Sequence, residues 1–505
     1  LDSMHNTFAH GVASGDPTGE AVVIWTRLSG QAYPAEVGWE VALNPGFDRI
    51  AASGYTTATA ERDWTVHVDV HGLRSATTYY YRFQAAGQQS PRGRTRTLGT
   101  GPIEHARFAF MSCAKFNAGH FNVYSRVAAR DDIDFVLHLG DYIYEASNTP
   151  PATQTPGADI GRPFEPRHEC RTLADYRERY SQYRRDPDLQ AMHAAHPMIA
   201  TLDDHELADG AWRDGADNHD EERDGSWAAR RAAAFRARWE WLPARQPDPD
   251  DPERVYRALR IGDLAELFLL DFRSQRDQPA ADASMASSAR SALGAEQKAW
   301  FVEGVTTTDA AWRLIGNPSP MARTWRPGLS DTTHKNLRAL KFMHAREDAL
   351  DEDQWDGYPA ERDDLLDAIF AAGAGRSILL AGDLHTSMAV EHTHPDRPEQ
   401  TVVVEVVTPS ITSQNLDEKL HVAPGSAGAE IAADFTRTLP GLRWCELESH
   451  GYVIVDVAPQ DIALQWWFVD TVLERTEVES CGQELLVRIG DPRLLQPLAT
   501  MSRAG

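Results

Sequence analysis

The chain has 505 residues, enough for two or three domains and a large buried core. Its composition, with 42% hydrophobic and 25% charged residues, is that of an ordinary globular protein. The 75 acidic residues outnumber the 50 basic ones and give a formal net charge of −25, which argues against a protein that binds nucleic acid through its phosphates. The sequence contains no run of about 18 apolar residues, so we expect no membrane-spanning helix.

The chain starts without the basic and apolar regions of a targeting segment, which is compatible with a mature exported protein after removal of a signal peptide. Its four cysteines, Cys113, Cys170, Cys445 and Cys481, are too few for a disulfide scaffold. If Cys113 binds a metal, an odd number of cysteines is left. The spacing does not show which of the other three are paired, if any.

Residues 1–100 have the pattern of an all-β domain. Short segments rich in β-branched and aromatic residues are separated by Gly, Ser, Asn and Pro, and they cover residues 22–28, 37–44, 64–70 and 78–85. Regular turns between short strands favour a small β-sandwich. The stretch HGLRSATTYYYRFQA resembles the last strands of a fibronectin type III domain. We therefore expect residues 1–100 to form an N-terminal β-sandwich with a packing role.

From Arg107 onward, predicted strands alternate with predicted helices, which is typical of a sheet with parallel strands. The segments RFAFMSCAKF and DFVLHLGD predict two buried strands, with a helix at residues 121–130 between them. Further strands are predicted within residues 196–206, 254–277, 312–320, 376–387, 401–413, 451–457 and 464–472, and helices at 173–193, 226–242 and 296–304. We assign residues 104–500 to this α/β domain.

Insertions rich in Pro and Gly or in Ala and Ser interrupt the predicted domain at residues 149–166, 246–252 and 278–291. Insertions of this kind are commonly lids or rims of sites. Residues 337–350 are charged, so we expect no core role for them.

Several of the apolar runs end in a group that can bind a metal. The segments MSCAKF, HLGDYIYE, TLDDHE, IGNPS and LLAGDLHTS offer Cys113, Asp141, Tyr144, Asp203, Asp204, His205, Asn317, Asp383 and His385. Taken singly, each group has an ordinary interpretation, because a Gly-Asp pair often only ends a strand and a buried cysteine usually only packs. Since the carboxyl edge of an α/β sheet usually holds the ligand, five such strand ends together favour a metal site.

The chemical types of the candidate ligands indicate which metal ions could bind. Thiolate, phenolate and imidazole suit a transition metal, and the phenolate favours iron(III). Carboxylate and amide oxygens suit a hard ion such as Ca²⁺, Mg²⁺ or Mn²⁺. An aspartate between two such ions can bridge them, and two metals about 3.5–4 Å apart form a clamp for in-line displacement at phosphorus.

The sequence resembles the PhoD-type alkaline phosphatases and, through them, the calcineurin-like metallophosphoesterases and purple acid phosphatases. The motifs that carry the resemblance span nearly the whole chain: FAHGVASGDPTGEAVVIWTRL, SCAKF, HLGDYIYE, DDHE, ARRAAAFRARWEWLPAR, LDFRSQRD, WDGYPAERDDLL, AGDLHTS, VVTPSITS and HGYVIVDV. The resemblance implies an α/β fold, namely a four-layer α/β/β/α metallophosphatase domain preceded by a β-sandwich. It also implies a secreted or periplasmic location.

The resemblance assigns the first metal to three residues. GDYIY is similar to the GDxxY motif of purple acid phosphatases, which implies that Asp141 bridges two metals and that Tyr144 binds iron(III). SCAKF stands where the first metal's GDxH or GDxG motif would be, which makes Cys113 a ligand.

The resemblance implies further metal ligands from two other motifs. DDHE stands in place of GNH(D/E), so Asp204 replaces a metal-binding asparagine and His205 is the histidine that faces the phosphate. GDLH stands in place of GHxH, with Asp383 and His385 as ligands. The added carboxylates favour Ca²⁺ as the second ion, with Mn²⁺, Mg²⁺ or Zn²⁺ as alternatives. Asn317 matches no motif and is predicted as a ligand from its strand-end position alone.

The implied activity is that of a phosphoric ester hydrolase, an alkaline phosphatase with phosphodiesterase activity that uses Asp141 and His205. A metal-activated hydroxide attacks in line with the ester oxygen, so no covalent enzyme intermediate is needed. His205 contacts a phosphate oxygen or protonates the leaving alcohol. A basic side chain offsets the developing charge. The candidates for this role, which the sequence does not rank, are Lys115, Arg213, Arg230 and Arg231.

The substrate is expected to be a small phosphate monoester or diester, with a phospholipid as the alternative. In that alternative the protein is a secreted phospholipase D that cleaves lipid headgroups. The acidic composition offers no polybasic patch for anionic membranes, which argues mildly against it. A non-catalytic module with a decayed site is disfavoured because all the motif ligands are present.

Overall fold

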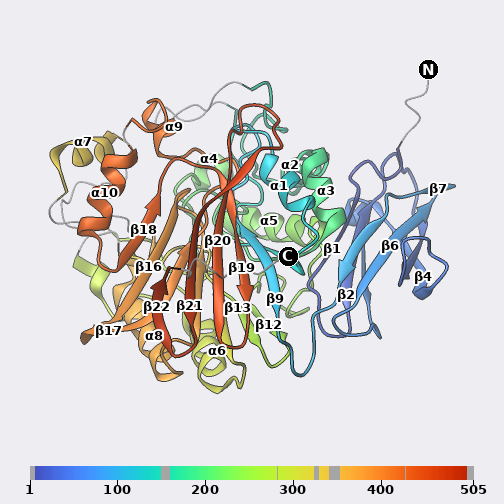
Figure 1. Ribbon diagram of the computed structural model, residues 1–505. Helices are drawn as coiled ribbons and strands as arrows, with labels where there is room; N and C mark the ends of the chain where they lie inside the picture. The colour runs from blue at the N-terminus through green and yellow to red at the C-terminus, as the bar shows by residue number, and fades with distance from the viewer. Residues whose placement is uncertain are drawn as a thin grey trace.

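A computed structural model describes residues 6–148, 160–280, 283–323, 329–339, 353–426 and 428–496 (Figure 1). The described strands form sheets of ten, seven and five strands. The N-terminal strands lie at one end of the molecule (Figure 1).

The ten-stranded sheet has four adjacent parallel strands, followed on one side by antiparallel strands from the C-terminal part of the chain and on the other by antiparallel strands from its N-terminal part. In order, its strands are β22 (Asp491–Leu495), β21 (Glu479–Arg488), β20 (Asp461–Val469), β19 (Gly451–Val457), β9 (Ala106–Met111), β10 (Phe135–His138), β11 (Pro197–Ala200), β1 (Val12–Gly15), β2 (Val22–Arg27) and β5 (Thr65–Val70). The predicted buried strands before Cys113 and Asp141 are β9 and β10, so both residues follow neighbouring parallel strands.

The seven-stranded sheet places four parallel strands side by side: β13, β14, β15 and β17. In order, its strands are β12 (Arg257–Ile261), β13 (Ala265–Leu269), β14 (Trp312–Gly316), β15 (Ser377–Ala381), β17 (Arg397–Val407), β16 (Ser387–His394) and β18 (Leu442–Glu446). Asn317 directly follows β14 and Asp383 follows β15, so the ends of this sheet deliver a second set of polar side chains.

Hydrophobic side chains of the two large sheets alternate between two environments because successive residues of a strand point to opposite faces. Leu137 of β10 and Leu314 of β14 belong to the cluster between the sheets. Their neighbours Val136 and Ile315 belong to outer clusters, which are shared with helices. The strands are therefore buried on both faces, as their continuous apolar runs predict.

The helices of the outer clusters lie on opposite sides of the sheets. Helices α1, α2, α3 and α5 contribute to the cluster on the ten-stranded sheet, and α6 and α8 to the cluster on the seven-stranded sheet. The described helices are α1 (Asn122–Ala128), α2 (Leu173–Arg184), α3 (Pro187–Ala195), α4 (Glu221–Asp224), α5 (Trp227–Trp241), α6 (Gly294–Thr307), α7 (Asp331–Ala339), α8 (Pro359–Ala371), α9 (Leu416–Leu420) and α10 (Gly428–Thr438). Short 3-10 helices are η1 (Ala60–Arg62), η2 (Ala283–Ala286) and η3 (Trp355–Gly357).

The helix predicted at residues 173–193 is two helices in the structure. Asp186 separates α2 from α3, and its side chain accepts hydrogen bonds from the backbone N–H groups of Asp188 (2.9 Å) and Leu189 (3.2 Å). Pro187 occupies the first turn of α3, where its missing N–H group is not needed. The Asp-Pro pair therefore begins a new helix instead of continuing the old one.

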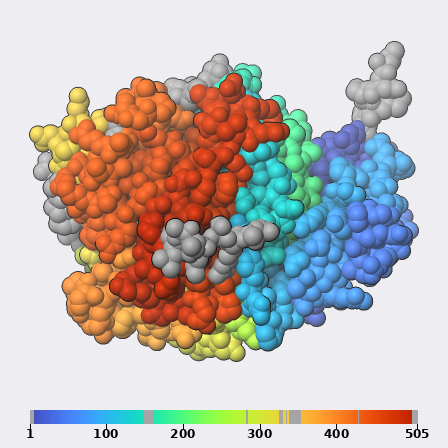
Figure 2. Space-filling model, in the orientation of Figure 1, coloured from blue at the N-terminus to red at the C-terminus, as the bar shows by residue number. Residues whose placement is uncertain are grey.

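The N-terminal region forms two layers, but one of them belongs to the large sheet. The five-stranded sheet contains β4 (Ile50–Ala58), β3 (Ala35–Ala42), β6 (Thr78–Ala85), β7 (Gln88–Gln89) and β8 (Gly93–Arg96). The facing strands β1, β2 and β5 extend the ten-stranded sheet, because β1 pairs in parallel with β11. One layer of this region is therefore part of the large sheet, and the region lies directly against the rest of the molecule (Figure 2).

Gly15 allows this junction to form. A Cβ atom at Gly15 would lie 2.2 Å from the carbonyl oxygen of Pro243 and 2.4 Å from that of Met198. Any other residue would push the N-terminal strands away from the end of β11.

Three other expectations concern cysteines, insertions and membranes. All four cysteines have free thiols, so none of them forms a disulfide.

The described residues do not include all of the insertions that were expected to be rims. Parts of residues 149–166 and 278–291, and most of residues 337–350, lie outside the described residues. Within the described part of the chain, no helix is long and apolar enough to cross a membrane.

Candidate metal centre

Asp141 lies at a sharp turn after β10. Gly140 has a φ of +98° and Asp141 a φ of +53°. A Cβ atom at position 140 would come within 2.3 Å of the backbone nitrogen of Asp203, so only glycine fits. The carboxylate of Glu206 accepts hydrogen bonds from the backbone N–H groups of Asp141 (3.0 Å), Tyr142 (2.5 Å) and Asp203 (2.8 Å). Glu206 thereby joins the loops that follow β10 and β11.

Four of the sequence-predicted ligands have a left-handed backbone. The φ values are +64° for Cys113, +53° for Asp141, +63° for Asp383 and +60° for His385. This conformation costs about 1–3 kcal/mol for each residue other than glycine and is concentrated at functional sites. The surrounding structure therefore holds four side chains in an unfavourable backbone geometry that directs them to one place.

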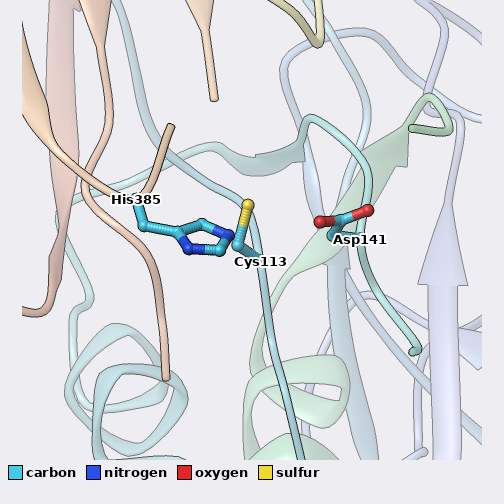
Figure 3. A group of neighbouring side chains, drawn as sticks. All are labelled: Cys113, Asp141 and His385. Carbon is cyan, nitrogen blue, oxygen red and sulfur yellow. The ribbon is translucent and has the colours of Figure 1, made fainter. Parts of the chain in front are cut away.

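The donor atoms of these side chains form three overlapping groups, each within 4.8 Å. The groups are Cys113–Asp141–His385, Asp141–Asp204–His205 and Asp141–Asp203–Asp204–Asp383. Figure 3 shows the first group, with the thiol of Cys113 between the imidazole of His385 and the carboxylate of Asp141 in this view. Asp141 is common to all three groups.

Tyr144 belongs with the first group. Its hydroxyl donates to Oδ2 of Asp141 at 2.7 Å and lies 3.4 Å from Nε2 of His385. Nδ1 of His385 is 3.1 Å from the carbonyl oxygen of Gln414. When Nδ1 donates its proton to that carbonyl, the lone pair of Nε2 is available to a cation. A thiol, a carboxylate, a phenol and an imidazole thus meet at one point.

The two adjacent aspartates of the DDHE motif have different partners. The carboxylate of Asp203 is held by Arg273, with distances of 2.5 Å from Nε to Oδ1 and 3.4 Å from Nη2 to Oδ2. Asp204 accepts a hydrogen bond from Gly210 through Oδ2 (2.7 Å), whereas its buried Oδ1 has no hydrogen-bond partner among the described residues. Burying a carboxylate oxygen without a hydrogen-bond partner lowers the stability of the folded protein. A cation bound to this oxygen would offset that loss of stability.

The electrostatics of the cluster also fit a bound cation. Burial and the neighbouring carboxylates raise the pKa of Asp141 and of Asp203 well above the usual range. Burial likewise raises the pKa of Asp383, although Nη2 of Arg273 contacts its Oδ2 at 2.7 Å. Carboxylates this close disfavour one another's ionised form, and a metal ion reverses that effect.

His205 is paired with a buried carboxylate. Nδ1 of His205 lies 2.8 Å from Oε2 of Glu145, whose Oε1 accepts a hydrogen bond from the backbone N–H of Asp209 at 2.8 Å. Burial opposes protonation of His205, but Glu145, Asp141 and Asp204 raise its pKa well above the ordinary value. Burial likewise opposes ionisation of Glu145, but His205 lowers the pKa of this carboxyl to about 2. The pair is therefore a charged couple beside Asp141.

The sequence and the fold of this chain both match known proteins. Residues 108–466 match the family described as PhoD-like phosphatase, and residues 2–99 match the N-terminal domain of that family. The chain belongs to the PhoD-like phosphatase family. It is 33% identical over 487 residues to alkaline phosphatase D of Bacillus subtilis (strain 168). The matched region covers 91% of this chain and 76% of the relative. A solved structure of PhoD matches 99% of this chain and 94% of its own with a TM-score of 0.85 and 28% identity.

Membership of the PhoD-like phosphatases confirms the predicted family and activity. The protein is a phosphoric ester hydrolase of the alkaline phosphatase D type, it is metal-dependent, and it acts on small-molecule phosphoesters. Its overall fold is the mixed sheet and helix fold of PhoD.

The basic residues proposed from the sequence differ in their surroundings. Arg213 pairs with Asp214 and Asp277, Arg230 with Glu169, and Arg231 with Glu253. The ammonium group of Lys115 lies 5.7 Å from the centre of the Tyr144 ring, and its charge interacts with Asp209, Glu145 and Asp141. Among the four, the structure places Lys115 beside the carboxylates of the candidate metal centre.

Sequence reasoning missed residues that hold the ligands in place. Examples are Glu145, Glu206, Arg273, Gln354 and Ser413. Glu145 and Glu206 belong to the motifs HLGDYIYE and DDHE, and Arg273 lies in LDFRSQRD, so the motif positions were visible but their roles were not. Asn317 accepts a hydrogen bond from Nε1 of Trp355 at 3.3 Å through its side-chain oxygen, the atom that a metal would need.

Ser413 gives a testable prediction for this phosphatase. Its Oγ lies 2.6 Å from the hydroxyl oxygen of Tyr144 and 3.0 Å from the carbonyl oxygen of Cys113. Because such outer partners orient metal ligands, we expect Ser413→Ala to lower metal affinity or kcat/KM by about 10–100-fold. Metal content and steady-state kinetics would measure this. Ser413→Thr keeps the hydroxyl, so its metal affinity and kcat/KM should fall much less. Equal decreases in the two variants would contradict a role for the hydrogen bond.

Proposed function

We propose that this phosphatase hydrolyses phosphate esters at a centre of two unlike cations that share Asp141. Cys113, Tyr144 and His385 would complete the first cation site, and Asp204 and Asp383 the second. The observation that supports this proposal best is that Asp141 is common to all three groups of donor atoms. The unpartnered oxygen of Asp204 adds support for the second site.

The proposed cations are Fe³⁺ and Ca²⁺. A thiolate, an imidazole and a phenolate suit iron(III) at the first site, and carboxylate oxygens suit a hard ion at the second, where Mn²⁺, Mg²⁺ or Zn²⁺ are alternatives. Asn317 stays a prediction as a ligand of the second ion. Its coordination would require Trp355 to give up the hydrogen bond to the Asn317 side-chain oxygen.

When bound, the cations supply positive charge that polarises the phosphoryl group and makes a water molecule more acidic. His205 would deliver a proton to the leaving oxygen or bind a phosphate oxygen, and Glu145 holds its Nδ1 so that Nε2 is the atom available. Lys115 would offset the charge that develops on the phosphate. Arg273 holds Asp203 and Asp383 in place through hydrogen bonds of 2.5 and 2.7 Å.

The finer features of the fold and setting are part of the same proposal. Hydrophobic clusters between the sheets and under the helices support a four-layer α/β/β/α arrangement for residues 104–500, with residues 1–100 as a β-sandwich that shares one sheet with it. A secreted or periplasmic location rests on the family resemblance alone.

The substrate is proposed to be a small phosphate monoester or diester. Release of phosphate from 4-nitrophenyl phosphate should be compared with release of choline from phosphatidylcholine vesicles. Faster choline release would replace this proposal with a phospholipase D that acts on lipid headgroups.

Tyr144→Phe tests the proposed iron site. Protein purified without chelators should contain iron and calcium and show a visible charge-transfer band from tyrosinate to iron(III). The band should disappear in Tyr144→Phe. Tyr142→Phe is the matched control, because the hydroxyl of Tyr142 contacts Nε2 of His193 (2.8 Å) and not the ligands, so the band should stay. Absence of the band in iron-loaded wild-type protein would refute the first-site assignment.

A further inference from the structure

Arg184, the last residue of α2, is a fully buried cation without a counter-ion. Its relative exposure is 0%, and it makes no ion pair within the described part of the chain. Its guanidinium faces the hydroxyl of Tyr142, and none of its three nitrogens has a further hydrogen-bond partner among the described residues. A guanidinium keeps its proton in proteins, so this charge stays in the interior.

The neighbours of Arg184 supply no negative charge. The groups that interact with its charge are the hydroxyls of Tyr142 and Tyr81. Neither hydroxyl carries a negative charge near neutral pH, because the ordinary pKa of tyrosine is about 10 and burial raises the pKa of Tyr81 above it. Burial and nearby arginines, Arg184 included, lower the pKa of His10 and His193, so these rings are neutral as well.

Arg179, five positions earlier on the same helix, is a buried arginine whose guanidinium has hydrogen-bond partners. Arg179 is also 0% exposed, but its guanidinium donates to the backbone carbonyls of Glu165, Tyr144, Ala146 and Pro166. The unmet hydrogen-bonding capacity of Arg184 is therefore not a general consequence of burial on α2.

Stacking on Trp25 compensates Arg184 only in part. The guanidinium carbon lies 4.1 Å from the centre of the indole ring, which is a favourable cation–π distance. The stacking contact involves only the flat face of the guanidinium. The N–H groups lie in its plane and still require hydrogen-bond acceptors. An isolated buried charge is costly unless it is paired and hydrogen-bonded.

We propose that a small monovalent anion, chloride, binds beside the guanidinium edge of Arg184. A single negative charge neutralises this arginine, whereas a dianion such as sulfate or phosphate would leave an excess charge among neutral tyrosine and histidine side chains. Ser14 lies in the same region, since its hydroxyl contacts that of Tyr81. An anion bound there would stabilise the junction of α2 with β1 and β2.

Thermal unfolding of the full-length, metal-loaded enzyme tests this site. The chloride concentration should be varied against gluconate at constant ionic strength. The midpoint of wild-type unfolding is expected to rise by roughly 1 °C for each tenfold increase in chloride above its dissociation constant. Arg184→Met should lose this dependence. A wild-type midpoint that does not respond to chloride, or an equal response in Arg184→Met, would overturn the proposal.

Arg185→Met is the matched control for the thermal experiment. It removes the same charge one residue further on, but the Arg185 side chain is 49% exposed and pairs with Glu165 at the surface. This variant should respond to chloride as the wild type does, and loss of the response would show a non-specific charge effect and contradict the proposal.

Bromide provides a second measurement that needs no variant. Crystals of the wild-type enzyme grown in bromide should give an anomalous scattering peak within hydrogen-bonding distance of the Arg184 nitrogens. Ordered density there without anomalous signal after complete exchange would mean that only water binds, and the proposal would be wrong.

Discussion

Asp141→Asn is expected to lower kcat/KM by about 10³-fold or more and to reduce the content of both metals. A bound cation contributes several kcal/mol of transition-state charge stabilisation, and each 1.36 kcal/mol corresponds to a factor of ten. Asparagine keeps the shape of Asp141 but removes its charge and one of its two oxygens. Because Asp141 is common to all three groups of donor atoms, this single change weakens both cation sites. Elemental analysis and steady-state kinetics would measure the two effects.

The control for Asp141→Asn is Asp309→Asn. The side chain of Asp309 is 91% exposed and pairs with Arg260 at the surface, so the same chemical change there should leave metal content and turnover unaltered. If Asp141→Asn retained wild-type metal content and turnover, Asp141 would not be shared between the cations. Loss of only one metal would assign Asp141 to one site and would also contradict the shared position.

Strands and helices can be predicted from the sequence where neighbouring residues have a clear hydrophobic or turn pattern. The pattern predicts β6 with the bounds that it has in the structure, Thr78–Ala85, because alternating aromatic residues and flanking turns define it. The strand β4 (Ile50–Ala58) is mostly exposed and contains Gly, Ser and Ala, so it gives no comparable signal. The pairing of β1 with β11 joins Ser14 to Pro197, and no local pattern specifies a contact between segments so far apart.

The candidate metal ligands can be named from the sequence, but the hydrogen-bond partners that distinguish them cannot. Asp203 and Asp204 are chemically identical and adjacent. They differ only because Arg273, which is distant in the sequence, binds the first and leaves Oδ1 of the second without a partner. Lys115 could not be ranked above Arg230 in the same way, because the partner of Arg230, Glu169, is brought to it only by folding.

His205→Gln is expected to lower kcat/KM by about 10²–10⁴-fold for phosphate esters of simple alcohols, and much less for 4-nitrophenyl phosphate. An alkoxide is a poor leaving group and needs a proton as the ester bond breaks, whereas 4-nitrophenolate leaves without one. Glu145 holds Nδ1 of His205 at 2.8 Å, which leaves Nε2 as the atom that can deliver the proton. Kinetics with both substrates would give the ratio of the two losses.

The ratio distinguishes the two roles that His205 could have. Proton donation to the leaving oxygen makes the loss depend on the leaving group, while binding of a phosphate oxygen makes it similar for both substrates. His168→Gln is the matched control, because His168 has a 63% exposed side chain and also pairs with a carboxylate, that of Asp175. Glu145→Gln should show the same dependence on the leaving group as His205→Gln, since it removes the group that orients and charges the imidazole. Equal losses for both substrates in the two site variants would mean that His205 binds phosphate and donates no proton.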